Sequence, residues 1–294
     1  MFGGTITALV TPFRDGRVDE EAYRELIDWQ IREGVSGIVP CGTTGESATL
    51  SHEEHNRVID IAVEEARGRV PVIAGTGSNS TAEAVRLTCH AKEAGADGAL
   101  LITPYYNKPT QEGLYRHYRA VAEEASFPLI PYNVPGRTGV NLLPETVARL
   151  ADLPEVVGIK EATGDLQQVS DVLELCGDRL AVLSGDDFTV LPLLSLGGRG
   201  VISVLSNVIP AEVSAMVQAF EAGDLARARD LHFRTMPLAR ALFLETNPIP
   251  VKSALALMGR IRPELRLPLC PLQEGTGKKL AAVLRDCGLL EGAA

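Results

Sequence analysis

The sequence predicts an α/β protein, a (β/α)8 barrel of the TIM type with a C-terminal helical extension. Short apolar runs alternate with amphipathic segments of helical period along most of the chain, and there are eight such runs. Small, polar or reactive residues follow each run. In a barrel the carboxyl ends of all strands meet on one face, where active sites lie. We expect the barrel over residues 1–223 and the extension over residues 224–294.

The eight apolar runs predict buried parallel strands, because short continuous apolar stretches bounded by turn residues are typical of them. They are Thr5–Val10, Gly37–Val39, Val70–Ala74, Gly98–Thr103, Pro128–Tyr132, Val156–Lys160, Leu180–Ser184 and Gly200–Val204. A doubly wound open sheet is the alternative. It would normally hold fewer strands in a similar length, and no GxGxxG motif follows the first run.

Amphipathic segments between the runs predict the helices of the barrel. They are Glu20–Arg32, Glu53–Ala66, Ala82–Ala94, Gly113–Ala125, Pro144–Leu150, Asp165–Leu175 and Phe188–Leu196. Two of these helices are expected to begin with capping boxes, at Ser51–Glu54 and Ser80–Glu83. From about Asp224 the apolar runs stop. The three helices predicted for the extension are Leu225–Leu244, Val251–Met258 and Gly277–Cys287.

Composition argues against several classes of partner and site. The net charge of −10 at pH 7 disfavours nucleic acid and anionic membranes. No apolar run approaches the ~18 residues of a transmembrane helix, and no secretory signal pattern begins the chain. Five cysteines form no CxxC pair: Cys41, Cys89, Cys176, Cys270 and Cys287. We therefore expect reduced thiols in a cytoplasmic protein, without a disulfide framework or a zinc site.

Lys160 is the most informative residue for function, because it ends the apolar run Val156–Lys160. Burial disfavours the charged ammonium, so its pKa should fall and more of it should be free amine. A neutral amine is a nucleophile that forms Schiff bases with carbonyl compounds. The alternative is a strand-end lysine whose charged head reaches solvent.

The loop Gly42–Glu46 follows one predicted strand and precedes a helix, and it is a candidate anion site. Its glycines let the backbone turn N–H groups toward an anion, next to the hydroxyls of Thr43 and Thr44. A phosphate loop would need a following lysine, which is absent, so a carboxylate is favoured. The alternative is a tight turn with no ligand.

Tyr132 and Arg137 lie at and just after the end of the fifth predicted strand. A buried phenol needs a hydrogen-bond partner and could relay the protons that Schiff-base formation requires. A guanidinium binds a carboxylate in a bidentate fork. The alternatives are a structural tyrosine and an exposed loop arginine.

Two further pairs are candidates for binding. Tyr105 and Tyr106 are adjacent, so in an extended chain one could face the site and the other an interface. His52 and His55 are three residues apart, unlike HExxH, and the sequence offers no third ligand. No metal site is therefore expected, and a small-ligand site near the barrel rim or a solvated helix face is favoured.

Four motifs, taken in this order and spacing, resemble those of the 4-hydroxy-tetrahydrodipicolinate synthase (dihydrodipicolinate synthase) family of pyruvate-dependent class I aldolases. They are Gly42-Thr43-Thr44-Gly45-Glu46, Thr103-Pro104-Tyr105-Tyr106-Asn107, Tyr132-Asn133-Val134-Pro135 with Arg137-Thr138-Gly139, and Gly158-Ile159-Lys160-Glu161-Ala162-Thr163-Gly164-Asp165. The resemblance covers essentially the whole chain, including Asn247–Lys252.

The resemblance implies a lyase that condenses pyruvate with L-aspartate 4-semialdehyde, the committed step of diaminopimelate and lysine biosynthesis. It uses no cofactor beyond a covalent Schiff base between Lys160 and pyruvate. The implied roles are as follows: Thr44, Tyr132 and Tyr106 form a proton relay, Tyr106 reaches the neighbouring subunit's site, Thr43 and Thr44 bind the pyruvate carboxylate, Arg137 binds the semialdehyde carboxylate, and the backbones of Gly185 and Ile202 line the pocket. The family is usually a homotetramer, a dimer of tight dimers.

The resemblance also implies feedback inhibition by L-lysine at a dimer-interface site. The matching positions are Ser47, Ala48, His52, His55, Asn79, Glu83 and Tyr105. His55 carries weight, because lysine-insensitive relatives usually hold another residue there. Glu83 and Asn79 suit an amino-acid ligand, and the helix N-terminus at Ser51 could help hold its carboxylate.

Two alternatives remain at this point. A sister aldolase on the same fold, such as N-acetylneuraminate lyase or a 2-keto-3-deoxy-sugar-acid aldolase, also uses pyruvate and a barrel lysine. The second threonine of Thr43-Thr44 and Arg137 disfavour it. A non-catalytic, metabolite-binding member of the fold is disfavoured by the intact set of Lys160, Tyr132, Tyr106 and Thr44.

Overall fold

The computed structural model describes residues 2–290, and its centre is an eight-stranded parallel sheet. The strands are β1 (Gly4–Ala8), β4 (Gly37–Val39), β5 (Ile73–Gly75), β6 (Gly98–Ile102), β7 (Leu129–Asn133), β8 (Gly158–Glu161), β9 (Ala181–Ser184) and β10 (Gly200–Ser203). Their order is β4-β1-β10-β9-β8-β7-β6-β5. A parallel bridge between Ile38 and Val72 joins the two edges. The sheet thus closes, and the predicted barrel is confirmed.

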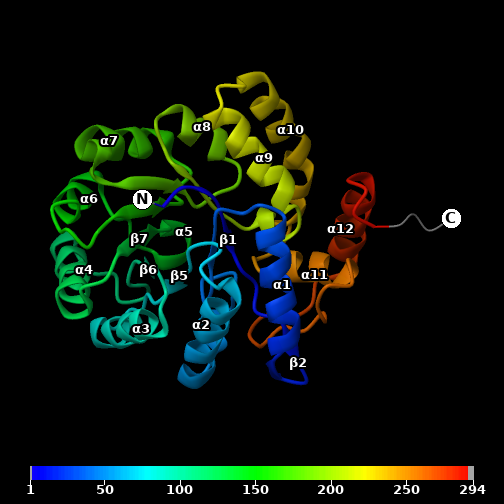
Figure 1. Cartoon of the computed structure of the whole chain (residues 1–294), viewed down its shortest axis with the longest axis horizontal. Coiled ribbons are helices and arrows are strands. Elements are labelled where there is room, and N and C mark those ends of the chain that lie inside the picture. Colours follow the sequence, from blue (N-terminus) through cyan, green and yellow to red (C-terminus); the bar gives the residue numbers. More distant parts are fainter. Residues whose placement is uncertain (1, 291–294) are drawn as a thin grey trace.

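Helices surround this barrel, as Figure 1 shows. They are α1 (Glu20–Arg32), α2 (His52–Ala66), α3 (Thr81–Ala94), α4 (Gln111–Ala125), α6 (Pro144–Leu150), α7 (Leu166–Cys176), α8 (Val190–Ser195) and α9 (Pro210–Glu221). The first seven lie within a few residues of the predicted segments. The sequence analysis assigned no range to α9, which follows the eighth strand and completes the repeat.

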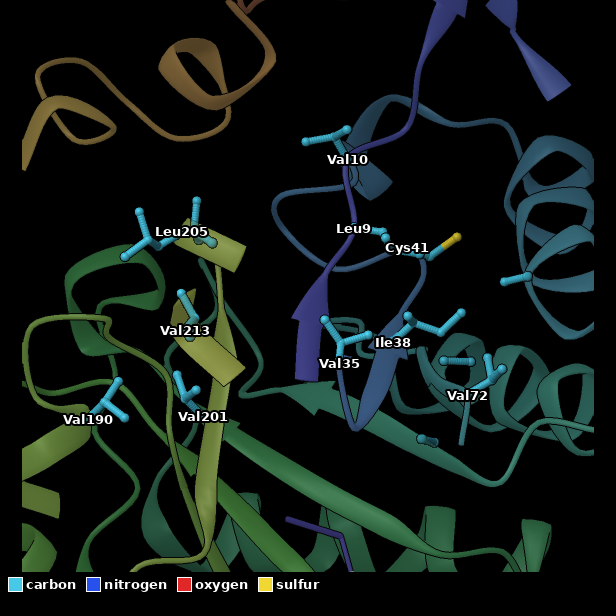
Figure 2. Packing of buried hydrophobic residues seen from close by; sticks show 14 of the residues in the cluster. Leu9, Val10, Val35, Ile38, Cys41, Val72, Val190, Val201, Leu205 and Val213 are labelled. Atoms are coloured by element: carbon cyan, nitrogen blue, oxygen red, sulfur yellow. The ribbon is translucent and has the colours of Figure 1, made fainter. Parts of the chain in front are cut away.

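The pleat of each strand divides its apolar residues between two cores, because successive side chains point to opposite faces. On β10, Ile202 lies in the barrel interior with Ile6, Ile73 and Ile130. Its neighbour Val201 packs outward in the larger core between strands and helices. Figure 2 shows part of this outer core, with Val201 on β10, Ile38 on β4 and Leu9 just after β1.

The C-terminal part forms three helices, α10 (Leu225–Ala241), α11 (Ile249–Leu257) and α12 (Glu274–Asp286). In Figure 1 they lie together at one side of the barrel, and α10 packs along α9. All three match predicted helices, although α10 ends three residues earlier and α12 begins three residues earlier than expected. In residues 2–290 no helix is both long and apolar enough to cross a membrane.

Two local expectations need comment. The capping box at Ser51 is confirmed, since its hydroxyl accepts from the N–H of Glu54 and the Glu54 carboxylate accepts from the N–H of Ser51. The capping box at Ser80 is wrong. The Glu83 carboxylate there accepts from the Ser78 hydroxyl, which also accepts from the N–H of Ser80. The Ser78 hydroxyl thus bonds to the Ser80 N–H and to the Glu83 carboxylate, the two groups that the predicted capping box would have paired with each other.

The structure also contains short elements that the sequence analysis did not predict. A two-stranded antiparallel hairpin, β2 (Phe13–Arg14) and β3 (Arg17–Val18), follows β1. A single helical turn, α5 (Pro135–Thr138), holds Arg137 just beyond β7. Turns of 3₁₀ helix occupy Ser47–Thr49, Gly177–Arg179 and Leu205–Asn207. These pieces are too short to produce a clear period, yet the first turn and α5 border the site described next.

Candidate active site

A cavity of about 240 Å³ opens where the carboxyl ends of the strands converge. Six of the residues predicted for catalysis or substrate binding line it: Thr43, Thr44, Tyr132, Arg137, Lys160 and Gly185. They come from five separate segments between residues 43 and 185. Their convergence favours a shared site over a separate structural role for each residue, although Arg137 is itself exposed.

Lys160 lies at the base of this cavity on β8, and only 5% of its surface is exposed. Its Nζ lies 4.1 Å from the centroid of the Tyr132 ring. Burial lowers the pKa of Lys160 to about 7, Asp187 opposes this shift, and Arg137 adds to it. About half of the amine is therefore neutral near pH 7, so it is available as a nucleophile rather than reaching solvent as a charge.

Tyr132 faces Lys160 because β7 and β8 pair in register at these two residues. Burial raises the pKa of the Tyr132 phenol to about 12, while Arg137 and the Thr43 hydroxyl act in the opposite direction. The phenol therefore stays protonated at neutral pH and can give and receive a proton without ionising in the resting site.

The two threonines of the predicted anion site have different neighbours in the structure. The Thr43 hydroxyl lies close enough to the Tyr132 phenol to lower its pKa. The Thr44 hydroxyl turns toward the C-terminal part of the chain and accepts a hydrogen bond from Asn247 Nδ2 at 3.0 Å. Adjacent residues of the Gly42–Glu46 loop point in different directions, a choice that the sequence Thr43-Thr44 does not reveal.

Asn247 is a site residue to which the sequence analysis gave no role. Besides its bond to Thr44, its carbonyl oxygen accepts from Arg137 Nη2 at 3.2 Å. It lines the cavity together with both of these residues. The only pointer to Asn247 in the sequence was its place in the Asn247–Lys252 motif. No spacing rule connects it to Arg137 or Thr44, which lie more than 100 positions earlier in the chain.

Two adjacent acidic residues, Asp186 and Asp187, follow β9 and add negative charge near Lys160. Asp186 lines the cavity, and burial raises its pKa. Asp187 is buried behind it and accepts from Ser203 Oγ at 2.6 Å and from the N–H groups of Val204 and Leu205 at 3.0 and 2.9 Å. Neither acid was given a role from the sequence.

Gly185 lines the cavity beside the side chain of Lys160. A Cβ placed on it would lie 2.9 Å from Lys160 Cε, so a larger residue would displace the lysine. Ile202, by contrast, is fully buried in the barrel interior and is not among the described residues that line the cavity. Its predicted place in the pocket lining is therefore not seen here.

Tyr106 is 90% exposed and adopts a positive φ of 72°, whereas Tyr105 is 38% exposed and lines the second cavity described below. Tyr106 lines neither this cavity nor the one described next, so within one chain it is apart from Lys160 and Tyr132.

A second cavity of about 470 Å³ adjoins the first and shares Thr43, Tyr132, Arg137 and Asn247 with it. Six of the seven positions predicted for lysine binding line it: Ser47, Ala48, His52, His55, Glu83 and Tyr105. The seventh, Asn79, lies at its border and donates from Nδ2 to the Tyr105 carbonyl at 3.2 Å. The structure thus gathers these residues from two α-helices, one 3₁₀ turn and two loops.

The second cavity contains both acidic and neutral groups. Burial lowers the pKa of His55 to about 4, so the imidazole is neutral at pH 7, and its Nδ1 is buried without a hydrogen-bond partner. His52 is exposed and its Nε2 lies 3.4 Å from Glu83 Oε1. Within residues 2–290, no group of three or more metal-ligating side chains is placed to hold a metal ion.

The sequence matches the profile of the Dihydrodipicolinate synthetase family over residues 1–287. The chain belongs to this family. The 4-hydroxy-tetrahydrodipicolinate synthase of Nitratidesulfovibrio vulgaris (strain DP4) is 68% identical over 290 residues, which cover 98% of this chain and 99% of that relative.

Solved structures of dihydrodipicolinate synthases superpose on the whole chain. The chloride-inhibited enzyme from Acinetobacter baumannii, complexed with pyruvate, is 49% identical with a TM-score of 0.97, and the match covers 99% of this chain and 100% of that one. The Cyanidioschyzon merolae enzyme with lysine bound is 42% identical with a TM-score of 0.95, covering 98% and 99%.

Membership of the dihydrodipicolinate synthetase family makes the chain an enzyme, a lyase of lysine and diaminopimelate biosynthesis. The predicted enzyme class is thereby confirmed, and the alternative of a non-catalytic binding protein is set aside. The family assignment rests on the whole chain. It agrees with a site built from residues that span positions 43 to 247.

Proposed function

We propose that this protein condenses pyruvate with L-aspartate 4-semialdehyde through a Schiff base at Lys160, giving 4-hydroxy-tetrahydrodipicolinate. One observation carries the proposal: a buried amine with a pKa of about 7 lies at the base of the cavity beside a protonated phenol. The relatives that share most of this sequence bear the name of that activity.

The reaction follows from the groups present. The neutral amine of Lys160 attacks the ketone carbon of pyruvate, and loss of water gives an iminium. Loss of a methyl proton gives an enamine, whose carbon adds to the aldehyde of the second substrate. The amino group of that substrate then attacks the iminium carbon, closes the ring and releases Lys160. Overall, one water leaves for each pair of substrates.

Each neighbouring residue has a part that its chemistry supports. Tyr132, with the Thr43 hydroxyl beside it, moves the protons of carbinolamine formation and dehydration. The loop with Thr43 and Thr44 receives the pyruvate carboxylate. Arg137 binds the carboxylate of the semialdehyde, and its bond to the Asn247 carbonyl leaves other guanidinium N–H groups for that anion.

The test is reductive trapping. Borohydride added with pyruvate should increase the mass of the protein by pyruvate less one water plus two hydrogens, at Lys160 alone. Lys160→Ala should show no addition and should lose several orders of magnitude in rate. Aspartate semialdehyde and N-acetylneuraminate are then compared as substrates. Turnover of the latter alone would assign the enzyme to a sister aldolase, and an untrapped wild-type protein would refute the Schiff base.

We further propose that L-lysine inhibits the enzyme by binding in the second cavity. Six of the seven expected positions line that cavity, and Glu83 supplies a carboxylate for an ammonium group. A relative of 42% identity has been solved with lysine bound. Lysine should lower the initial rate of the wild type, and His55→Ala should abolish this effect. His90→Ala is the control, because His90 pairs with Asp60 and is not among the residues that line the cavity.

The assembly we propose is a homotetramer built from two tight dimers, located in the cytoplasm. Tyr106 supports the dimer: a large aromatic that is 90% exposed and apart from its own Lys160 is suited to contact a second subunit. In that arrangement Tyr106 would extend the proton relay of the partner's site. Sedimentation at catalytic concentrations measures the assembly directly.

A further inference from the structure

A network of buried polar side chains lies behind the strand pair that carries Lys160 and Tyr132. Register places Asn133 opposite Glu161, one residue beyond the pair of Tyr132 and Lys160. Because the pleat alternates, Asn133 and Glu161 point away from the cavity, toward the surrounding helices. Both are buried, with exposures of 0% and 2%. A carboxylate in such a place needs hydrogen-bond partners.

Glu161 receives three hydrogen bonds, all from neutral donors. The N–H of Thr163 donates to Oε1 at 2.8 Å, and Asn133 Nδ2 and Gln168 Nε2 each donate to Oε2 at 3.2 Å. Oε2 already accepts from two N–H groups, so a proton on that oxygen would be directed against a donor. The arrangement therefore suits an ionised Glu161, although burial raises the pKa of this carboxyl.

The two amides are oriented by backbone groups whose roles are unambiguous. Asn133 Oδ1 accepts from the N–H of Leu142 at 2.9 Å, so its Nδ2 must face Glu161. Gln168 Nε2 donates to the Leu142 carbonyl at 3.3 Å, so the nitrogen of this second amide also faces Glu161. Asn141 joins them, accepting from Asn133 Nδ2 at 2.8 Å and donating to Gln168 Oε1 at 2.7 Å.

These four side chains come from four different pieces of the chain that meet at the site. Asn133 ends β7, Glu161 ends β8, and Gln168 lies in the first turn of α7. Asn141 belongs to the segment that leads out of α5, the turn that carries Arg137. The paired strands end at Asn133 and Glu161, and the bond between these two side chains continues the link at that point.

We propose that Glu161, Asn133, Asn141 and Gln168 are positioning residues of the reaction, with an anionic Glu161 at their centre that sets the separation of Lys160, Tyr132 and Arg137. This inference rests on the Schiff-base reaction proposed above. None of the four lines the catalytic cavity, so each acts through the neighbouring catalytic residue. A misplacement of about 1 Å in such a site can cost about 100-fold in rate.

The test compares Glu161→Gln and Gln168→Ala with the control Gln167→Ala. Glu161→Gln keeps the shape but turns an N–H₂ group toward a donor, and Gln168→Ala removes one of the three donors. Gln167 is the exposed neighbour of Gln168 on the same helix and has the same side chain. Active sites are counted by borohydride trapping with labelled pyruvate, and kcat is expressed per trapped site.

We expect kcat per trapped site to fall about 10- to 100-fold in Glu161→Gln and Gln168→Ala. The pyruvate KM should stay within about twofold of the wild-type value, because the Thr43–Thr44 loop lies outside the network. Gln167→Ala should match the wild type. A purely structural network would lower Tm but leave kcat per trapped site unchanged, and that result would overturn the proposal. If Glu161→Gln does not fold, Gln168→Ala decides alone. Failure to trap the wild type would instead refute the Schiff base itself.

Discussion

At the scale of single residues, burial changes the chemistry of Lys160 more than any neighbouring charge does. Removal of the ammonium from water is the largest influence on its pKa, while Asp187 and Arg137 act in opposite directions. The same burial keeps the Tyr132 phenol protonated. One desolvated pocket therefore holds a partly neutral amine beside a neutral phenol near pH 7, the states that the proposed nucleophile and proton carrier require.

The rate of Schiff-base formation should report the pKa of Lys160. Because only the free amine attacks pyruvate, kcat/KM for pyruvate should fall as pH drops below about 7. Initial rates from pH 5.5 to 9 measure this limb, with borohydride trapping rates as an independent readout. A limb centred near pH 10 would mean that Lys160 keeps an ordinary ammonium.

The depressed pKa of Lys160 also predicts a stability change. The pKa of Lys160 is about 7 in the folded protein, against 10.5 for an ordinary lysine, the value expected in the unfolded chain. Between these two pH values the unfolded chain binds more protons than the folded one, so stability rises with pH. Lys160→Met should therefore increase the free energy of unfolding by as much as about 4 kcal/mol at pH 7. Urea unfolding at pH 7 and 9.5 should show the gain shrinking with pH; a constant gain would contradict the linkage.

Arg137 should act on one substrate only. Removing its guanidinium leaves the carboxylate of the semialdehyde without its bidentate partner, so Arg137→Ala should raise the KM for the semialdehyde about 10- to 100-fold through loss of about 1.5–3 kcal/mol. Steady-state kinetics with each substrate varied measures this. Unchanged semialdehyde kinetics would remove Arg137 from its proposed role.

At the scale of elements, the loop after β4 is held by the C-terminal helices. Glu46, in a left-handed conformation at the end of the Gly42–Glu46 loop, accepts from Lys252 Nζ of α11 at 2.5 Å, and both side chains are fully buried. Its other oxygen accepts from the N–H of Arg266 at 3.1 Å. Asn247, just before α11, bonds Thr44. The C-terminal part thus orients the threonines of the catalytic loop.

Removing one partner of the Glu46–Lys252 pair should lower the free energy of unfolding far more than replacing both partners with neutral side chains. Lys252→Met leaves an uncompensated buried carboxylate and should cost about 3–5 kcal/mol of unfolding free energy. Glu46→Gln combined with Lys252→Met removes that charge and should recover more than about 1 kcal/mol of the loss. Denaturant unfolding gives both values. Lys278→Met, which breaks an exposed pair with Glu274, should change little, and additive losses at Glu46 and Lys252 would argue against a coupled pair.

At the scale of the whole molecule, the two cavities are neighbours that share a wall. Thr43, Tyr132, Arg137 and Asn247 line both, so a ligand in the larger cavity contacts residues of the catalytic one. Tyr106 is exposed, and in the proposed dimer it would meet the second subunit. Regulation and assembly are therefore expected to act on the catalytic loops directly.

Mixed oligomers test whether Tyr106 serves the partner's site. Lys160→Ala and Tyr106→Ala subunits should each be nearly inactive alone. In a mixed dimer, the Tyr106→Ala subunit keeps its Lys160 and receives an intact Tyr106 from its partner, so one of the two sites should recover. Activity after co-expression, compared with each variant alone, measures this. No recovery in verified mixed dimers would mean that Tyr106 does not complete the other site.

Much of this architecture was predictable because it depends on local patterns. The apolar runs identified all eight barrel strands, and helical periods identified the first seven barrel helices. Strand ends then placed Lys160, Tyr132 and Gly185 on one face. The hairpin at Phe13–Val18 and the turn α5 were not predicted, since two- and four-residue elements carry no period. The cap at Ser80 failed because Ser78 competes for the same groups.

The sequence by itself determined the barrel, the Schiff-base candidate and the family, because these depend on periodicity and on motifs contiguous along the chain. Only the tertiary structure decided that Asn247 bonds Thr44, that Lys252 is buried against Glu46, and that Glu161 lies at the centre of a network behind Lys160. Those outcomes depend on side-chain direction and on contacts across up to about 200 residues of chain. No local pattern encodes such contacts, because burial and hydrogen bonding are settled only when distant segments pack together.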